Sequence, residues 1–162
     1  MLQVAVIVIS SKIVSGTEED TGRVALEQMV AEIPGRVNSY DIVADDRRAV
    51  AERLAAVADA GRTDLILTIG GTGVRPTDWA PEATRDVVEK EVPGIGEAMR
   101  QESVKKVKTA MLSRGTAGIR GGTLIVNLPG SSRGAKDNLG VILPILEHTV
   151  GKIHKQAASH RR

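Results

Sequence analysis

The stretch that decides the fold is Asp64-Leu65-Ile66-Leu67-Thr68-Ile69, which runs directly into Gly70-Gly71-Thr72-Gly73. A short apolar run without alternation is typical of a strand buried on both faces, and such strands belong to parallel sheets. Residues 4–9 and 123–128 show the same pattern, and residues 37–43 form a weaker predicted strand. Helical patterns separate these strands. We therefore predict an α/β fold, a three-layer, open, mostly parallel, Rossmann-like sheet with helices on both faces.

The predicted helices follow from apolar residues spaced three and four positions apart. They cover residues 24–33, 47–60, 81–91, 95–107 and 135–153. Pro144 lies inside the last pattern. Because proline lacks the N–H that a helix interior uses, we expect a break or kink near residues 140–144. The 162 residues are too few for two ordinary domains. We predict one domain over residues 1–150 and a basic tail over residues 151–162.

The composition, 41% hydrophobic and 26% charged, is that of a globular domain. The absence of cysteine excludes disulfide bonds, thiolate zinc sites and a thiol nucleophile. The net charge is +2, but the tail holds four basic residues and no acid, so residues 1–150 carry −2. With one tryptophan, one tyrosine and no phenylalanine to stack on bases, we expect no nucleic-acid binding. No apolar run could cross a membrane and no leader-like segment is visible, so we expect a cytoplasmic protein.

The loops that follow the three strong strands are candidates for a ligand site. Ligands of open α/β sheets bind beyond the carboxyl ends of the strands, where these loops meet. The loops contain Ser10, then the Gly70–Gly73 turn, then Pro129, Gly130 and Ser131. Glycine lets backbone N–H groups approach a phosphate, and the third loop opens a helix whose N-terminus favours anions. We expect phosphate binding, with a simple tight turn as the alternative for the glycines.

Two familiar nucleotide motifs are excluded by spacing. A dinucleotide G-x-G-x-x-G would need glycine at position 76, where Pro76 stands, and no P-loop pattern occurs in the chain. The glycine turn is therefore interpreted as a phosphate loop of another kind.

Aspartates stand at two of the predicted strand ends. Asp78 follows the glycine turn by five residues, and Asp45 and Asp46 follow the strand over residues 37–43. Mg²⁺ binds to one or two carboxylates and completes its shell with water and substrate phosphates, so Asp45 and Asp78 are candidate metal ligands. The alternative is that these aspartates cap helices, Asp78 the one near Pro81 and the acidic pair the one that starts at Arg47.

The sequence offers few candidates for a general base. Its three histidines, His148, His154 and His160, lie on the last helix or in the tail, where we expect them to face solvent. Chemistry without histidine or cysteine points to a nucleophile that is already ionised, such as a phosphate that attacks another phosphate. Positioning and charge neutralisation would then supply most of the rate.

Arg114 and Trp79 each leave two interpretations open. Arg114 lies in a glycine- and threonine-rich segment, where its guanidinium could bind a phosphate with two hydrogen bonds or be an ordinary loop arginine. Trp79, the only tryptophan, adjoins Asp78 and either packs in the core or lines the cleft, where its flat ring could stack.

Several motifs in the same order resemble the molybdenum-cofactor biosynthesis MogA/MoaB family. The resemblance covers residues 4 to about 146. Its motifs are residues 64–73, Asp78, Pro81-Glu82-Ala83-Thr84, Val92-Pro93-Gly94, Met111-Leu112-Ser113-Arg114 and Thr123-Leu-Ile-Val-Asn-Leu-Pro-Gly130.

The resemblance implies a molybdopterin-binding α/β domain. Its active members transfer AMP from Mg-ATP to the terminal phosphate of molybdopterin and release pyrophosphate. They form trimers or hexamers of two trimers, and the molybdenum-insertion protein is an expected partner. Carried over by position, Asp45 and Asp78 are the catalytic and Mg²⁺-binding carboxylates, and residues 70–73 are the nucleotide-phosphate loop. The residues that resemble cleft-lining positions are Ser113, Asn127, Pro129, Gly130 and Ser131. Ser10 and Arg114 are further candidate binding residues because of the loops in which they lie.

The chain departs from the family pattern near Asp78. Thr77-Asp78-Trp79-Ala80-Pro81 stands where the family usually has Arg-Asp-Val-Thr-Pro, Ala44 replaces a proline, and Ser132 stands where proline is common. These departures favour an alternative function, a non-catalytic pterin-binding paralogue that acts in cofactor assembly or as a carrier. A third class, a nucleotide-dependent α/β enzyme with another substrate, also remains open.

Overall fold

The computed structural model describes residues 1–159, and side chains through Lys155. Its sheet has six strands in the order β2-β1-β3-β6-β5-β4. Their bounds are β1 Leu2–Ile9, β2 Gly35–Val43, β3 Leu65–Ile69, β4 Lys90–Glu91, β5 Ala117–Arg120 and β6 Thr123–Leu128. The first three strands and β6 are parallel, whereas β5 and β4 are antiparallel to their neighbours. The predicted mostly parallel sheet is confirmed.

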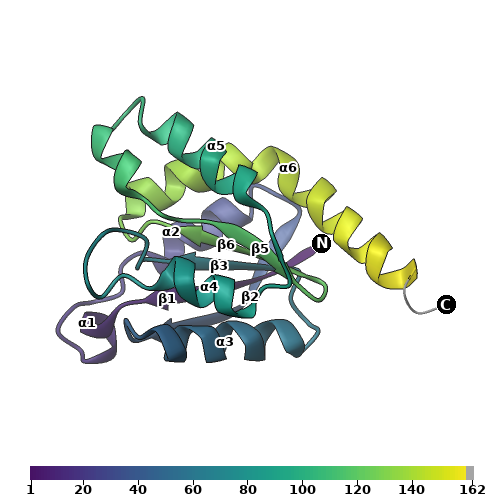
Figure 1. The fold of residues 1–162 in the computed structure, drawn as a ribbon, viewed down its shortest axis with the longest axis horizontal. Helices are drawn as coiled ribbons and strands as arrows, with labels where there is room; N and C mark the ends of the chain where they lie inside the picture. Colours follow the sequence, from purple (N-terminus) through teal and green to yellow (C-terminus); the bar gives the residue numbers. More distant parts are fainter. Residues whose placement is uncertain (160–162) are drawn as a thin grey trace.

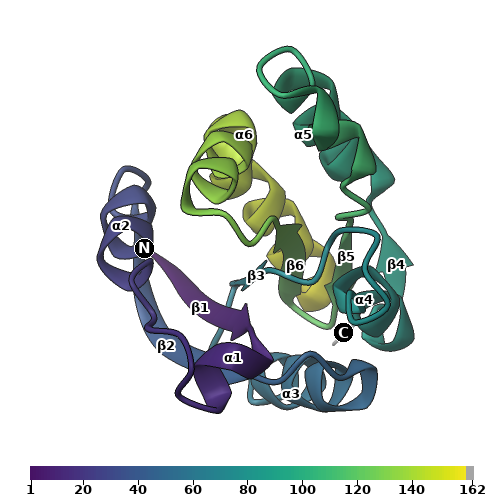
Figure 2. The ribbon, with the colours of Figure 1, turned by 90° about the vertical axis from the view of Figure 1, so that its left-hand side faces the viewer.

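Helices cover both faces of this sheet, as Figures 1 and 2 show. Their bounds are α1 Ser11–Val14, α2 Arg23–Val30, α3 Arg47–Asp59, α4 Ala80–Val87, α5 Pro93–Ser103 and α6 Ser132–Ser159, with a 3₁₀ turn η1 at Lys108–Leu112. On one face α2, α5 and α6 pack on side chains such as Val6 and Leu67, and on the other α3 and α4 pack on Ile7 and Ile66. β1, β3 and β6 are buried along nearly their whole length, as their unbroken apolar runs predict.

Three predicted helices end earlier than expected, and the one predicted to reach residue 33 ends at Val30. The helix predicted to reach residue 91 ends at Val87, and the one predicted to reach residue 107 ends at Ser103. The short strands β4 and β5 were not predicted. β5 contains Gly118, where an added Cβ would lie 2.6 Å from Val88 Cγ1, so the glycine that suggests a loop is required by close packing.

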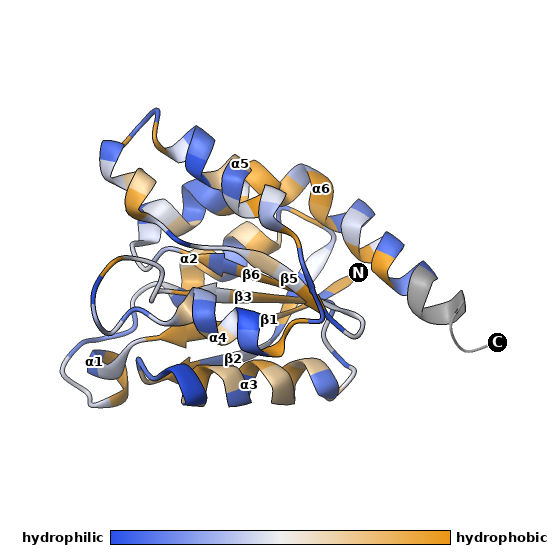
Figure 3. Ribbon diagram, viewed as in Figure 1, coloured by the Kyte–Doolittle hydropathy of each residue, from blue (hydrophilic) through white to orange (hydrophobic). Residues whose placement is uncertain are grey.

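The prediction of a break at Pro144 is wrong, because α6 continues through it to Ser159, and a kink there stays a prediction. Pro144 cannot donate to the Gly140 carbonyl four residues earlier, but both residues are exposed and water can satisfy that carbonyl. Buried Leu139 and Leu146 hold the helix to the sheet on either side. The apolar stripe of α6 is visible in Figure 3.

The predicted boundary at residue 150 falls inside α6. Val150 and Ile153 are both buried, so the described part of the predicted tail is the last part of a packed helix. His154 Nε2 lies 3.2 Å from Asp64 Oδ1, and His148 is exposed. His160, Arg161 and Arg162 lie outside the described residues. Within residues 1–159, none of the helices has the length and apolar character of a membrane span.

The loop between α1 and α2 is attached to β2 by Tyr40, the single tyrosine. Its hydroxyl donates to Asp20 Oδ2 over 2.7 Å, and the Arg23 guanidinium carbon lies 4.7 Å from the ring centroid. Burial, followed by the hydrogen bond to Asp20 and the charge of Asp20, raises the pKa of the Tyr40 phenol. Asp20 thereby favours the neutral phenol and holds the loop against the sheet.

This raised pKa predicts a pH limit on stability. In the unfolded chain the phenol ionises near pH 10. Its contribution to the free energy of unfolding is therefore complete below about pH 10 and is lost as the pH rises toward the higher folded pKa. Absorbance at about 295 nm should show no phenolate in native protein near pH 10, but phenolate in denatured protein. Asp20→Asn should shift the native titration to lower pH. Equal titration of native and denatured protein would contradict this assignment.

Candidate functional site

The carboxyl ends of the four parallel strands meet at the left-hand edge in Figure 1, which faces the viewer in Figure 2. Ser10 follows β1, Asp45 follows β2, Gly70 follows β3 and Pro129 follows β6. The sequence prediction that these loops converge is confirmed. The site is therefore built by four segments that lie far apart in the chain.

The glycine turn is forced by close approach of the strand ends. Gly70 and Gly71 have φ values of +100° and +69°, in the left-handed region that favours glycine. A Cβ on Gly70 would lie 2.7 Å from the Ile9 carbonyl oxygen, and a Cβ on Gly130 would lie 3.3 Å from Gly70 Cα. The glycines thus bring the loops after β1, β3 and β6 into contact. The turn is tight, as the alternative interpretation holds, and this tightness also shapes the candidate site.

Asp45 and Asp46 have different roles. Asp45 Oδ2 accepts the Ser11 N–H over 2.9 Å, and the Ser11 hydroxyl accepts the Asp45 N–H over 2.8 Å. This reciprocal pair ties the loop after β1 to the loop after β2. Asp46 is the N-cap of α3 and accepts the Ala49 N–H over 2.8 Å. The capping interpretation is confirmed for Asp46 and is wrong for Asp45.

Asp78 does not cap α4. Trp79 occupies the N-cap position, with no side-chain capping bond, and Asp78 Oδ2 instead accepts the Arg75 N–H over 2.9 Å. Gly73 leaves room for this carboxylate, because a Cβ there would lie 2.8 Å from Asp78 Oδ2. Asp78 thus closes the loop after the glycine turn and remains partly exposed at the edge.

Arg114 binds protein groups with all three of its guanidinium nitrogens. Its Nε donates to the Gly73 carbonyl over 2.7 Å, its Nη2 to the Asp78 carbonyl over 2.9 Å, and its Nη1 to the Glu82 carboxylate. The Arg114 N–H also donates to the Thr72 carbonyl over 2.7 Å. Nε and Nη2 therefore hold the loop from Gly73 to Asp78, and Nη1 ties that loop to α4 through Glu82. Phosphate binding by Arg114 stays a prediction.

Asn127 is buried and makes hydrogen bonds to other protein groups. Its amide donates to the hydroxyls of Thr68 and Thr84, over 3.0 and 2.9 Å, and its carbonyl accepts the Thr116 N–H. The side chain is 1% exposed, so it positions β3, α4 and the start of β5 without reaching a ligand. Asn127 was predicted to line the cleft, and the structure places it beneath the cleft.

Ser131 is the N-cap of α6, because its hydroxyl accepts the Gly134 N–H over 3.1 Å. It lies at the junction of two cavities. One, of about 300 Å³, lies between η1 and the start of α6 and includes Thr72, Gly73, Ser113 and Pro129. The other, of about 290 Å³, lies between β1 and α2 and includes Gly130 and the acidic residues Glu18, Glu19 and Asp20.

Several site residues were missed by sequence reasoning. Arg100 and Arg133 line the first cavity, and Glu82 is the partner of Arg114. Arg133 could have been found, since it lies in the first turn of the helix that follows the Pro129 loop. Arg100 could not have been found from the sequence. Its guanidinium donates to the Gly115 carbonyl, and the sequence does not show that these two segments are neighbours.

Asp45 and Asp78 stay candidate ligands for a metal ion. Among the described residues, no three histidine, cysteine, aspartate or glutamate side chains are grouped as a metal site would require. Asp45 and Asp78 each use Oδ2 to accept one backbone N–H. Their segments adjoin, since the Arg47 guanidinium carbon lies 5.9 Å from the Trp79 ring centroid. A Mg²⁺ site usually has one or two protein carboxylates as ligands, and phosphates and water supply the others.

A family model described as a probable molybdopterin binding domain matches residues 5–148. The chain belongs to the MogA/MoaB family. A molybdopterin adenylyltransferase from Helicobacter pylori is 37% identical over 154 residues, which cover 94% of this chain and 88% of that protein. The Escherichia coli K12 protein of the same name is 36% identical, over 85% and 72% of the two chains.

Solved structures of MogA/MoaB proteins have the same fold. The crystal structure of the molybdopterin biosynthesis enzyme MoaB from Thermus thermophilus matches with a TM-score of 0.89 and 42% identity, over 94% of this chain and 96% of that one. The molybdopterin biosynthesis Mog protein from Mycobacterium ulcerans matches with a TM-score of 0.83 and 36% identity, over 94% and 99%. The family and fold inferred from the ordered motifs are confirmed.

The Arg114 contacts predict how the edge responds to mutation. Arg114→Lys keeps the charge but has one side-chain nitrogen in place of three, so it cannot donate to the Gly73 carbonyl, the Asp78 carbonyl and Glu82 together. We expect the free energy of unfolding to fall by about 1–3 kcal/mol and amide exchange at Arg75 and Asp78 to become faster. The free energy is measured by denaturant unfolding and the exchange by mass spectrometry.

Arg85→Lys is the matched control. Arg85 pairs with Glu91 over 3.1 Å, but both side chains are half exposed, so this change should stay within about 0.5 kcal/mol. Equal effects of the two substitutions would show that Arg114 is an ordinary surface residue.

Proposed function

We propose that this protein is a molybdopterin adenylyltransferase, which transfers AMP from Mg-ATP to the phosphate of molybdopterin and releases pyrophosphate. The observation that carries the proposal is the meeting of Asp45, Asp78 and the Gly70 and Gly130 loops at one edge of the sheet. Relatives that bear this enzyme name align over most of the chain.

In this reaction a phosphate oxygen of molybdopterin attacks the α-phosphorus of ATP. The bond from that phosphorus to the bridging oxygen breaks, and pyrophosphate carries away the electron pair. The nucleophile is already ionised, so no protein base is needed. This is consistent with a sequence that lacks cysteine and with an edge at which the described residues include no histidine. The protein orients the two phosphates and holds these negatively charged groups close to each other.

Each segment of the edge has a task in that orientation. The glycine turn lets phosphate oxygens approach the backbone, and the N-terminus of α6 presents free N–H groups beside Ser131. Asp45 and Asp78 would hold Mg²⁺, which supplies neutralisation of the phosphate charge when it is bound. Arg114 keeps Asp78 in place through the Asp78 carbonyl.

A non-catalytic pterin-binding paralogue is the second candidate. Trp79 and Ala80 replace residues of the family pattern, and α4 begins with no side-chain cap. Such a protein would bind pterin without forming pyrophosphate. We further propose a cytoplasmic homotrimer, or a hexamer of two trimers, which passes its product to the molybdenum-insertion protein.

The proposal predicts a selective effect of removing single negative charges. Asp45→Asn and Asp78→Asn should each keep the fold, because the Asn carbonyl can still accept the Ser11 or Arg75 N–H. Each should lower the rate of adenylyl transfer by at least ~10²-fold, because a metal-binding charge is lost. The assay contains purified protein, ATP, magnesium and molybdopterin, and follows adenylylated pterin and pyrophosphate.

Asp46→Asn is the matched control at the next position. It removes the same charge from a residue that caps α3, and Asn caps a helix equally well, so we expect a rate within about twofold of the wild type. Equal losses at positions 45 and 46 would show that the effect comes from general charge. A wild-type rate for Asp78→Asn would assign Asp78 a purely structural role. Pterin binding without pyrophosphate release in the wild-type protein would establish the second candidate.

A further inference from the structure

Trp79 lies on the surface of the site edge and not in the core. It is 37% exposed, although the next residue, Ala80, is fully buried. The core interpretation of the lone tryptophan is therefore wrong. Its place in the chain is also specific, because it joins Asp78 to the first turn of α4.

An ion pair that joins α3 to α4 lies beside the Trp79 ring. Arg47 Nε and Nη2 donate to the two carboxylate oxygens of Asp86, each over 2.8 Å, and the Arg47 guanidinium carbon lies 5.9 Å from the ring centroid. The hydrogen bond from Arg47 is the main cause that lowers the pKa of Asp86. A fixed guanidinium beside an aromatic ring favours one orientation of that ring.

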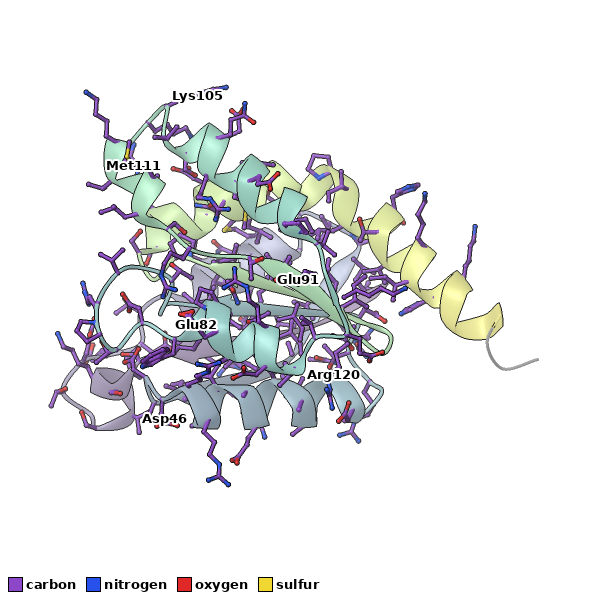
Figure 4. All side chains as sticks on the ribbon, in the orientation of Figure 1. Asp46, Glu82, Glu91, Lys105, Met111 and Arg120 are labelled. Carbon is purple, nitrogen blue, oxygen red and sulfur yellow. The ribbon has the colours of Figure 1, made fainter. Side chains whose placement is uncertain are left out.

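This contact places the ring between the two carboxylate segments. Arg47 begins α3 two residues after Asp45, and Trp79 directly follows Asp78. Asp46 and Glu82, labelled in Figure 4, mark the starts of these two helices on the same side of the molecule. A ligand whose phosphates lie between Asp45 and Asp78 would therefore have its remaining atoms within reach of the exposed ring.

We propose that Trp79 is a stacking platform for the planar nitrogen heterocycle of such a ligand. The inference rests on the proposed function, in which both substrates, ATP and molybdopterin, carry a heterocycle near a phosphate. Stacking on tryptophan tolerates any flat ring and contributes enough affinity to be measured by substitution. The orientation imposed by Arg47 reduces the entropy lost when the ring is covered.

The first test measures affinity by titration calorimetry, so that it does not depend on turnover. Wild type, Trp79→Phe and Trp79→Leu are titrated with Mg-ATP, with neopterin monophosphate and with magnesium tripolyphosphate, which has no ring. Trp79→Leu should bind one of the two ring-bearing ligands about tenfold more weakly, while Trp79→Phe keeps most of the affinity. Tripolyphosphate binding should be unchanged. The ligand that loses affinity identifies the stacked ring as adenine or pterin.

Ile145→Ala is the control for loss of an exposed apolar side chain, since Ile145 is 43% exposed on α6. It should leave all three affinities unchanged. Equal affinities of wild type and Trp79→Leu for both ring-bearing ligands would overturn the proposal. An equal loss for tripolyphosphate would overturn it too, because the ring would then act only by supporting the loop.

A second readout separates this inference from the proposed function. If the wild-type protein transfers AMP, Trp79→Leu should raise KM for the stacked substrate about tenfold and change kcat much less. Transfer with no effect of Trp79→Leu on KM or on affinity overturns the stacking proposal alone. Ring-dependent affinity in a wild-type protein that forms no product overturns the adenylyltransferase proposal and supports the platform.

Discussion

The close approach of Gly70 to its neighbours sets the geometry of the whole site edge. The turn after β3 passes so near the Ile9 carbonyl and Gly130 that no side chain fits between them. The loops after β1, β3 and β6 therefore form one continuous surface, at which α6 begins. The polar groups of the site edge are placed relative to that surface. The sheet thus requires this turn, and the same turn forms the floor of the proposed ligand site.

The sequence was informative where burial dictates residue type. The runs in β1, β3 and β6 are apolar because both faces are covered, and this pattern alone predicts a parallel sheet and the edge where its loops meet. It was less informative for β4 and β5, which are only two and four residues long. Their pairing depends on contacts across the chain, such as that of Gly118 with Val88, which leave no local period.

The site shows the same contrast between features that the local sequence predicts and features that depend on contacts across the chain. The positions of Asp45, Asp78 and the glycine loops follow from their places after strands. The partners of Arg114 and the inward direction of Asn127 do not, since a polar residue at a strand end looks the same whether it binds a ligand or the protein. Arg114 illustrates the difference: a guanidinium in a glycine-rich loop suggests phosphate, yet three protein acceptors already surround it. Only the fold shows which acceptors are near.

Asn127 also affects the register in which β6 pairs with its neighbours. It is the polar residue in an otherwise apolar β6 interior, and its partners lie on β3, on α4 and beside β5. A slip of β6 by one residue would turn its amide to the opposite face of the sheet, away from the Thr68 and Thr84 hydroxyls, and bury it unpaired. An all-apolar strand between two equally apolar layers would lack such a penalty. One buried amide thus distinguishes the native alignment of the central strands from its near neighbours during folding.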